Sequence, residues 1–230
     1  MSAREELRYS PTVRSRLLEG LPPSDRDLVI GSATRKRFSA NSLITLQGNP
    51  ADRLYLLVRG SVRLFHTTSD GRKIMLLWMA PGDTFGAITM LASESLYIMS
   101  SEAVKDSEVL GWDRPTFRAC VEKFPQILDN AITAAAGYIE WYVAAHVALT
   151  CHTARERLAH VLLGLSRSIG EKVPGGVEII ITNQELADAA NITPYTASRL
   201  MSKWQKNRAV TKGRGKVVLR SADRLLLAMV

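Results

Sequence analysis

The sequence contains only two cysteines, Cys120 and Cys151, and no run of apolar residues approaching the length of a membrane span. Two isolated cysteines do not build a disulfide framework, and their spacing resembles no zinc or iron–sulfur site. The first ten residues, MSAREELRYS, lack the apolar core of a secretory signal peptide. We therefore expect a cytoplasmic protein with no membrane partner and no metal site.

Motifs of the common enzyme classes are also missing. The sequence has no phosphate-binding P-loop, no nucleophile elbow around a serine, and no pair of carboxylates on one predicted helix face. The four histidines and the scattered acidic residues form no catalytic constellation. The sequence therefore predicts a protein that is not an enzyme.

Positive charge is concentrated toward the C-terminal end of the chain. The 230 residues carry a net charge of +8, and their number allows one or two domains. Residues 151–230 hold 13 Lys and Arg against 6 Asp and Glu, a net charge of +7, whereas residues 1–150 have a net charge of +1. A surface that neutralises nucleic-acid phosphates requires such a basic segment.

Two short helices joined by a tight turn are predicted within this basic segment. Thr182 is a helix N-cap residue, and Glu185, three residues later, completes a capping box. The helix ends at Asn191, a residue that tolerates the left-handed conformation of a turn. Thr193 and Pro194 then cap and open a second helix. The pair is typical of a helix-turn-helix motif.

The second helix has an apolar and a polar face, and a basic hairpin follows it. Residues 208–212 and 216–220 are expected to be strands around a Gly213-Arg214-Gly215 turn. Two helices alone also fit an ordinary helical hairpin, but with a basic wing they predict binding to double-stranded DNA. We expect the base-reading residues to be Tyr195, Thr196, Ser198 and Arg199. We expect phosphate contacts from Ser202, Lys203, Lys212, Arg214 and Lys216.

Short β-runs separated by Gly, Asp and Asn turns extend from Thr34 to about Trp112. The clearest runs are residues 43–48, 54–58, 61–66 and 73–78. Strands this short and regularly spaced predict a sandwich or jelly roll. Short helices are expected before them, up to about Ala33.

A long helix is predicted after about Pro115. Its apolar residues recur at alternating spacings of four and three, which makes three consecutive heptads. A helix packed on its own domain gives the same one-sided pattern, but DNA-binding motifs usually bind paired half-sites, which favours a homodimer on a palindromic operator. The predicted dimer seam consists of Leu128, Ile132, Ala135, Ile139, Tyr142, His146 and Leu149.

A helix break at residues 150–153 gives the predicted domain boundary. Residues 1–122 are then a β-roll sensor domain with N-terminal helices, residues 123–150 a dimerisation helix, and residues 151–230 a winged helix-turn-helix domain. The predicted fold class is α+β.

This order of elements resembles the cyclic-AMP receptor protein / fumarate-and-nitrate regulator (Crp/Fnr) superfamily of bacterial transcription regulators. The resemblance covers nearly the whole chain and is carried by LYLLVRGSVRL at 54–64, PGDTFG at 81–86 and ITNQELA at 181–187. It implies that the N-terminal domain is a double-stranded β-helix like that of cyclic-nucleotide-binding domains. It also implies a dimer that binds a promoter and regulates transcription through RNA polymerase.

Departures from the family pattern bear on the effector. Members that bind cyclic nucleotides use a Glu for the ribose and an Arg-Ser pair for the phosphate, and those positions here are Ala87, Tyr97 and Ile98. A cyclic phosphate needs a cation or backbone donors to replace its hydration, so we expect no cyclic AMP binding in that mode. Iron–sulfur members use several cysteines, mostly near the N-terminus, and residues 1–50 have none, so we expect no iron–sulfur cluster.

The DNA-contacting positions of the family are partly kept. Thr182, Asn183 and Gln184 match positions that touch phosphate, and Arg199 matches an Arg that can contact guanine. Typical members carry an Arg-Glu pair where this chain has Pro194-Tyr195. We therefore expect its operator to differ from the one those members share.

Four interpretations of sensing stay open on the sequence. An apolar effector between the roll and the long helix is preferred, in a pocket of Phe85, Ala87, Tyr97, Ile98, Tyr138, Trp141 and Tyr142. Haem is an alternative cofactor, with candidate ligands in the methionines, His66, His146, His152 and Cys120. In a third interpretation, protonation of His146 weakens the dimer seam and makes the regulator sensitive to pH. In the fourth, there is no effector, and activity depends only on the abundance of the protein. A ligand-binding module without promoter function would not need the basic winged helix.

Overall fold

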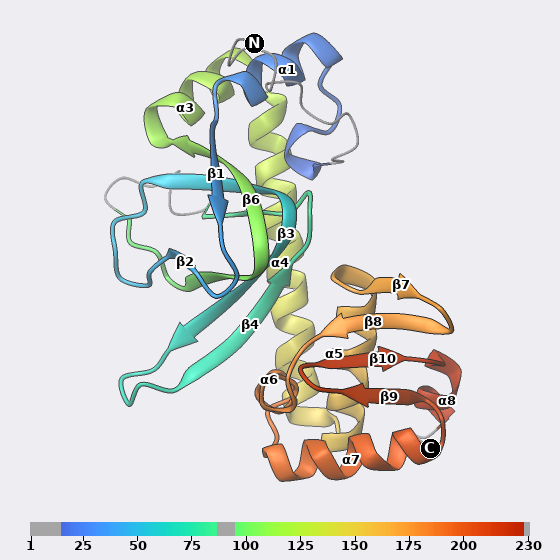
Figure 1. The fold of residues 1–230 in the computed structure, drawn as a ribbon. Coiled ribbons are helices and arrows are strands. Elements are labelled where there is room, and N and C mark those ends of the chain that lie inside the picture. The colour runs from blue at the N-terminus through green and yellow to red at the C-terminus, as the bar shows by residue number, and fades with distance from the viewer. Residues whose placement is uncertain (1–14, 87–94, 228–230) are drawn as a thin grey trace.

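The computed structural model describes residues 15–86 and 95–227, which form an N-terminal β-roll and a C-terminal winged-helix unit (Figure 1). Helix α4 (Gln126–Cys151) runs alongside the roll and ends beside the C-terminal unit. This arrangement confirms the predicted α+β fold class, with roll, long helix and winged helix in that order.

Two long antiparallel strands, β3 (Arg53–Thr67) and β6 (Ser100–Asp113), form the centre of the roll. The strand order is β1-β6-β3-β4, with β2 paired to β6 and β5 paired to β3. The outer strands are β1 (Thr34–Phe38), β2 (Leu43–Thr45), β4 (Lys73–Met79) and β5 (Thr84–Phe85).

The two separate strands predicted at 54–58 and 61–66 are one continuous strand, β3. Gly60 lies within it at a φ of +101°, and the register with β6 shifts on both sides of this residue. A Cβ at position 60 would lie 2.6 Å from the Cα of Ser107. Glycine alone fits this crowded left-handed position, so the chain bends here inside one strand instead of ending one strand and starting another.

The end of the roll near the N-terminus is closed by short helices. They are η1 (Arg16–Leu18), α1 (Pro23–Gly31) and α3 (Arg114–Lys123), and they pack with α4 around the buried indole of Trp112. The Trp112 Nε1 donates to the carbonyl oxygen of Val29 at 3.0 Å and to the hydroxyl of Ser32 at 3.1 Å. Apolar residues from β3, β6 and α4 complete this core: Leu54, Leu56, Leu110, Ile127 and Ala131.

The C-terminal unit places helices on a four-stranded antiparallel sheet of order β7-β8-β10-β9. Strand β7 (Glu171–Val173) pairs with β8 (Gly176–Ile180), because Gly175 between them, at a φ of +76°, lets the chain fold back. The helices are α5 (Ala154–Ser168), α6 (Asn183–Ala189), α7 (Pro194–Lys206) and α8 (Ala222–Leu227). The strands are β7 (Glu171–Val173), β8 (Gly176–Ile180), β9 (Val210–Gly213) and β10 (Lys216–Leu219).

Two fully buried tryptophans allow a matched test of how much indole hydrogen bonds stabilise these cores. The Trp112 Nε1 has two hydrogen-bond partners, whereas the Trp204 Nε1 is buried without one among the described residues. We expect Trp112→Phe to lower the free energy of unfolding by about 1 kcal/mol more than Trp204→Phe, because only the first change breaks hydrogen bonds. Guanidinium unfolding of both variants measures the difference, and an equal or larger loss for Trp204→Phe would contradict it.

Candidate DNA-binding interface

Helix α6 begins with the predicted capping box. The backbone N of Thr182 donates to the Glu185 carboxylate at 2.7 Å, and the backbone N of Glu185 donates to the Thr182 hydroxyl at 3.2 Å. The turn after α6 passes through Asn191 in the left-handed region, at a φ of +49°. Both features of the helix-turn-helix that the sequence predicted are present.

Helix α7 buries one face and leaves the other open. Ala197, Met201 and Trp204 lie in the core of the C-terminal unit. Tyr195 is 77% exposed at the first turn of the helix, and Ser198 and Arg199 are exposed on the same side. This polar face can enter a DNA groove without any rearrangement of the C-terminal unit.

The first turn of α7 is held by local hydrogen bonds. Thr193 caps the helix by accepting from the backbone N of Thr196 at 3.2 Å, and its hydroxyl is 2.9 Å from that of Thr196. The Asn183 amide donates to the carbonyl oxygen of Pro194 at 2.9 Å. Thr196 is therefore half-buried and already bonded, so it is less free to read bases than Tyr195 and Arg199.

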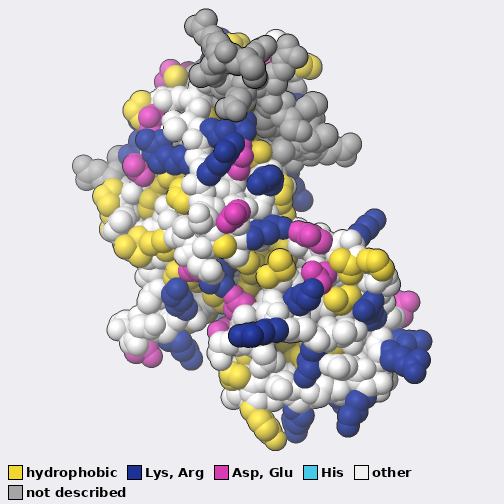
Figure 2. All heavy atoms as spheres, viewed as in Figure 1, with side chains coloured by type: hydrophobic (Ala, Val, Ile, Leu, Met, Phe, Trp, Pro, Cys, Tyr) yellow, Lys and Arg dark blue, Asp and Glu magenta, His cyan; other side chains and the backbone are white. Residues whose placement is uncertain are grey.

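The predicted phosphate-contacting residues lie around this helix. Thr182, Asn183 and Gln184 are exposed at the start of α6, and Lys203 is exposed on α7. The Lys212 ammonium donates to the Ser202 hydroxyl at 2.9 Å and so connects the wing to α7. Arg214 is exposed at the wing tip, and Lys216 pairs with Glu178 at 2.8 Å. Figure 2 shows Lys and Arg side chains projecting from this lower part of the molecule.

Sequence reasoning missed Arg157 on α5. Its guanidinium donates to the carbonyl oxygens of Ala190 at 2.8 Å, Asn191 at 3.2 Å and His152 at 2.7 Å. It thereby binds the turn of the helix-turn-helix to residues 152–153, the break between α4 and α5 that we call the hinge. Two of its acceptors lie more than thirty residues away in the chain, so no local pattern could have indicated them.

A pocket of about 200 Å³ lies where η1, the β4–β5 turn and α4 meet. Two of the predicted effector residues, Tyr138 and Trp141, line it, together with Arg16, Leu77, Gly82, Asp83, Thr84, Ala134 and Gly137. The Tyr138 hydroxyl donates to the carbonyl oxygen of Thr84 at 2.9 Å. Burial raises the pKa of the Asp83 carboxyl and the pKa of the Tyr138 hydroxyl.

The other predicted effector residues lie elsewhere. Phe85 stacks on Tyr55 in the roll core with ring centroids 5.2 Å apart. Tyr97 is buried, and its hydroxyl donates to the carbonyl oxygen of Arg53 at 2.9 Å. Ile98 and Tyr142 are exposed, and Ala87 lies outside the described residues.

The predicted seam lies on a largely exposed face of α4, beside the face that packs on the roll. Ile132, Ile139, Tyr142, His146 and Leu149 are exposed, whereas Leu128 and Ala135 are half-buried. Val143 and Val147 add to this apolar surface, whereas Trp141 lies on the pocket side of the helix. The adjacent face of the helix packs on the roll through Ile127, Ala131 and Tyr138.

The candidate haem ligands are dispersed. His66 lies 3.3 Å from the carbonyl oxygen of Ile98, His152 stacks on His160, and Cys120 is buried in the core below α1. Within residues 15–86 and 95–227 no three His, Cys, Asp or Glu side chains gather as a metal site. None of the helices in this described part is both long and apolar enough to cross a bilayer.

A β-roll joined by a long helix to a winged helix with an exposed, basic reading face defines a transcription regulator that binds DNA. The comparisons agree with this class. A family model described as the cyclic nucleotide-binding domain matches residues 35–124, and one described as the Crp-like helix-turn-helix domain matches residues 156–227.

Relatives span nearly the whole chain. This chain is 30% identical over 208 residues to the "Cyclic AMP receptor protein" of Thermus thermophilus. The matched region covers 90% of this chain and 94% of that protein. The chain is 25% identical over 222 residues to the "Anaerobic regulatory protein" of Bacillus subtilis, covering 88% and 90%. The structure of FixK2 from Bradyrhizobium japonicum matches with a TM-score of 0.73 at 26% identity, covering 86% and 98%.

The chain belongs to the Crp/Fnr superfamily, as its sequence resemblance predicted, and it is a transcription regulator of that type.

Proposed function

We propose that this regulator acts as a homodimer that binds a two-fold symmetric operator and acts on transcription through RNA polymerase rather than as an enzyme. The observation that carries the proposal is the open face of α7, with Tyr195, Ser198 and Arg199 exposed beside a basic wing. Such a face offers donors to base edges and cations to phosphates.

Base preference follows from the chemistry of this face. Arg199 can donate two hydrogen bonds to the O6 and N7 of one guanine. Helix α7 carries no acidic residue, so it has no carboxylate to accept from the amino group of cytosine. Tyr195 instead presents a ring that can contact the methyl group of thymine. The operator should differ from that of relatives that carry a Glu at this position.

Arg199→Ala tests base reading, with Lys203→Ala as the matched control. We expect Arg199→Ala to cost about 1–3 kcal/mol on the operator and to relax the preference at one base pair. Lys203→Ala should weaken binding to all sequences and reduce the salt slope by about one. Competition binding with operator and random DNA measures both. An unchanged ratio of operator to random affinity in Arg199→Ala would show that Arg199 does not read a base.

The dimer is proposed from the exposed face of α4. Ile132, Ile139, Tyr142 and Leu149 are apolar side chains at heptad spacing that a single chain leaves in water. Packing this face against a second copy would bury them and place two α7 helices for two half-sites. His146 would then meet the same residue of the second copy.

Ile139→Glu tests the dimer. Ile139 is 62% exposed, so a charge there should leave the single chain folded but disrupt the apolar contact between two copies. We expect Ile139→Glu to sediment as a monomer. We also expect it to bind a full operator no more tightly than a single half-site. Leu28→Glu on α1, at a site 54% exposed, is the control and should stay dimeric. A dimeric Ile139→Glu variant would contradict the proposed seam.

The effector is proposed to bind the pocket between η1, the β4–β5 turn and α4, and not to be cyclic AMP bound in the family's mode. Tyr97 occupies a position where binding members hold the phosphate, but its hydroxyl is already bonded to the backbone of Arg53. The next position is the exposed, apolar Ile98. Neither offers a cation to replace phosphate hydration. The aromatic rings of Tyr138 and Trp141 suit a largely apolar ligand.

We expect saturating cyclic AMP to leave the affinity for the operator unchanged, because those positions supply no cation for its phosphate. Fluorescence anisotropy with labelled operator measures this. Native mass spectrometry of the purified protein shows in parallel whether a ligand is retained as a mass above two chains. A clear rise in operator affinity with cyclic AMP would contradict the prediction.

A further inference from the structure

One row of side chains across the sheet of the roll contacts the C-terminal unit. Trp78 on β4, Arg63 on β3 and Glu102 on β6 are direct cross-strand neighbours. Val62 and Leu64 flank Arg63 and are buried inside the roll, so alternation turns Arg63 outward. Trp78 from this row packs against the core of the C-terminal unit.

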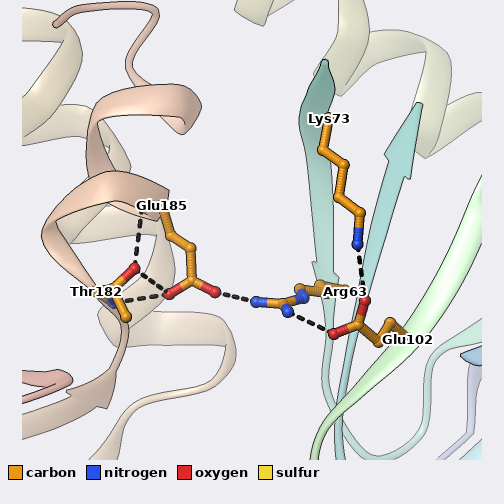
Figure 3. A network of polar contacts seen from close by, with 5 residues as sticks. All are labelled: Arg63, Lys73, Glu102, Thr182 and Glu185. Carbon is orange, nitrogen blue, oxygen red and sulfur yellow. Dashed lines mark hydrogen bonds and ion pairs between the residues drawn. The ribbon is translucent and has the colours of Figure 1, made fainter. Parts of the chain in front are cut away.

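An ionic network connects the row to the DNA-binding helices (Figure 3). The Arg63 guanidinium pairs with Glu102 of the roll and with Glu185 of α6. Lys73 also pairs with Glu102, at 3.4 Å. We call Arg63, Lys73, Glu102 and Glu185 the interdomain bridge. Its central side chains are largely buried, with Arg63 and Glu185 each 18% exposed, so each charge depends on its partners.

Glu185 has two functions at once. One carboxylate oxygen accepts from the backbone N and from the hydroxyl of Thr182, at 2.7 Å each, and so completes the capping box. The other oxygen accepts from Arg63. The start of α6 is therefore joined to the roll by one carboxylate. A change in the position of Arg63 would be transmitted directly to the helix-turn-helix.

The bridged state leaves the DNA-binding face open. Thr182, Asn183 and Gln184 are exposed beside the bridge. Helix α7 lies at the end of the molecule away from the roll (Figure 1), with Tyr195 and Arg199 exposed. The bridge thus blocks none of the residues expected to contact DNA. It connects the helix-turn-helix that carries them to the roll.

We propose that Arg63 is a positioning residue for DNA recognition, which acts through Glu185 to hold the recognition helix at the orientation that paired half-sites require. The inference rests on the proposed homodimer. Two recognition helices gain from binding together only when their separation matches the operator. A helix-turn-helix that pivots freely would lose this gain while still binding one half-site.

Glu185→Gln separates this role from folding. Glutamine can complete a capping box as glutamate does, so the start of α6 is kept while the ion pair to Arg63 is lost. The Arg63–Glu102 pair within the roll also remains. Removing a negative charge beside DNA would by itself strengthen binding. A loss of affinity therefore cannot come from the simple change in charge.

The experiment first selects an operator from random DNA with the unaltered protein. Affinities are then measured for that operator, for operators whose half-site spacing differs by one or two base pairs, and for a single half-site. We expect Glu185→Gln to bind the full operator about tenfold more weakly, to bind the half-site equally well, and to discriminate less among spacings. Arg63→Met and the double variant complete a double-mutant cycle, in which the two losses should not add.

Glu171→Gln is the matched control. It removes a second ion pair between the units, Lys105–Glu171, whose side chains are 37% and 64% exposed. Such an exposed pair contributes little, so the spacing preference should be unchanged.

Four results would overturn the positioning role. Equal losses of Glu185→Gln on the half-site and the full operator would indicate damage to the helix itself. Unchanged affinity and spacing preference would show that the bridge does not orient α7, and tighter binding to the full operator would show that it restrains the DNA-binding unit. A selection that returns no paired half-sites would overturn the proposed function together with this inference, whereas the other outcomes leave that function intact.

Discussion

The pairing of β3 with β6 is the interaction on which the rest of this structure depends. Because side chains alternate along β3, Leu54 and Leu56 point into one buried core, and Val62 and Leu64 point into another. The same alternation points Arg63 toward the DNA-binding unit. Strand β6 continues through Trp112 into α3, which positions the start of α4. The roll therefore determines both where the long helix runs and which surface meets the helix-turn-helix.

Charged groups in this protein join elements that are distant in sequence. Arg157 binds the turn between α6 and α7 to the hinge after α4, and Glu185 connects α6 to the roll. A guanidinium suits this task because its donors form a planar fork that can serve several acceptors. The Arg157 bonds to Ala190 and His152 and the Arg63–Glu185 pair are partly buried, so the loss of one partner would leave a charge or a carbonyl without its bond.

The two ends of α4 have different surroundings. Near its start, Ile127 and Ala131 are buried against the helices that close the roll, while the later turns expose Ile139, Tyr142, Val143 and Val147. A pocket lies between the helix and the β4–β5 turn on the side facing the roll. A ligand in this pocket would contact α4, and the seam face of the same helix is proposed to pair with a second copy. Effector binding and dimer geometry could then influence each other through this one helix.

Local patterns in the sequence determined the helix-turn-helix. The capping box at Thr182 and Glu185, the left-handed Asn191 and the wing glycines depend on residues a few positions apart, so their chemistry can be recognised along the chain. The fold class and the exposed face of α7 follow from the same local periodicity. Tertiary structure alone decided that two predicted strands are one bent β3, that Phe85 and Tyr97 fill the roll, and that Arg63 meets Glu185. Those outcomes depend on groups brought together from distant parts of the chain, which composition and spacing do not encode.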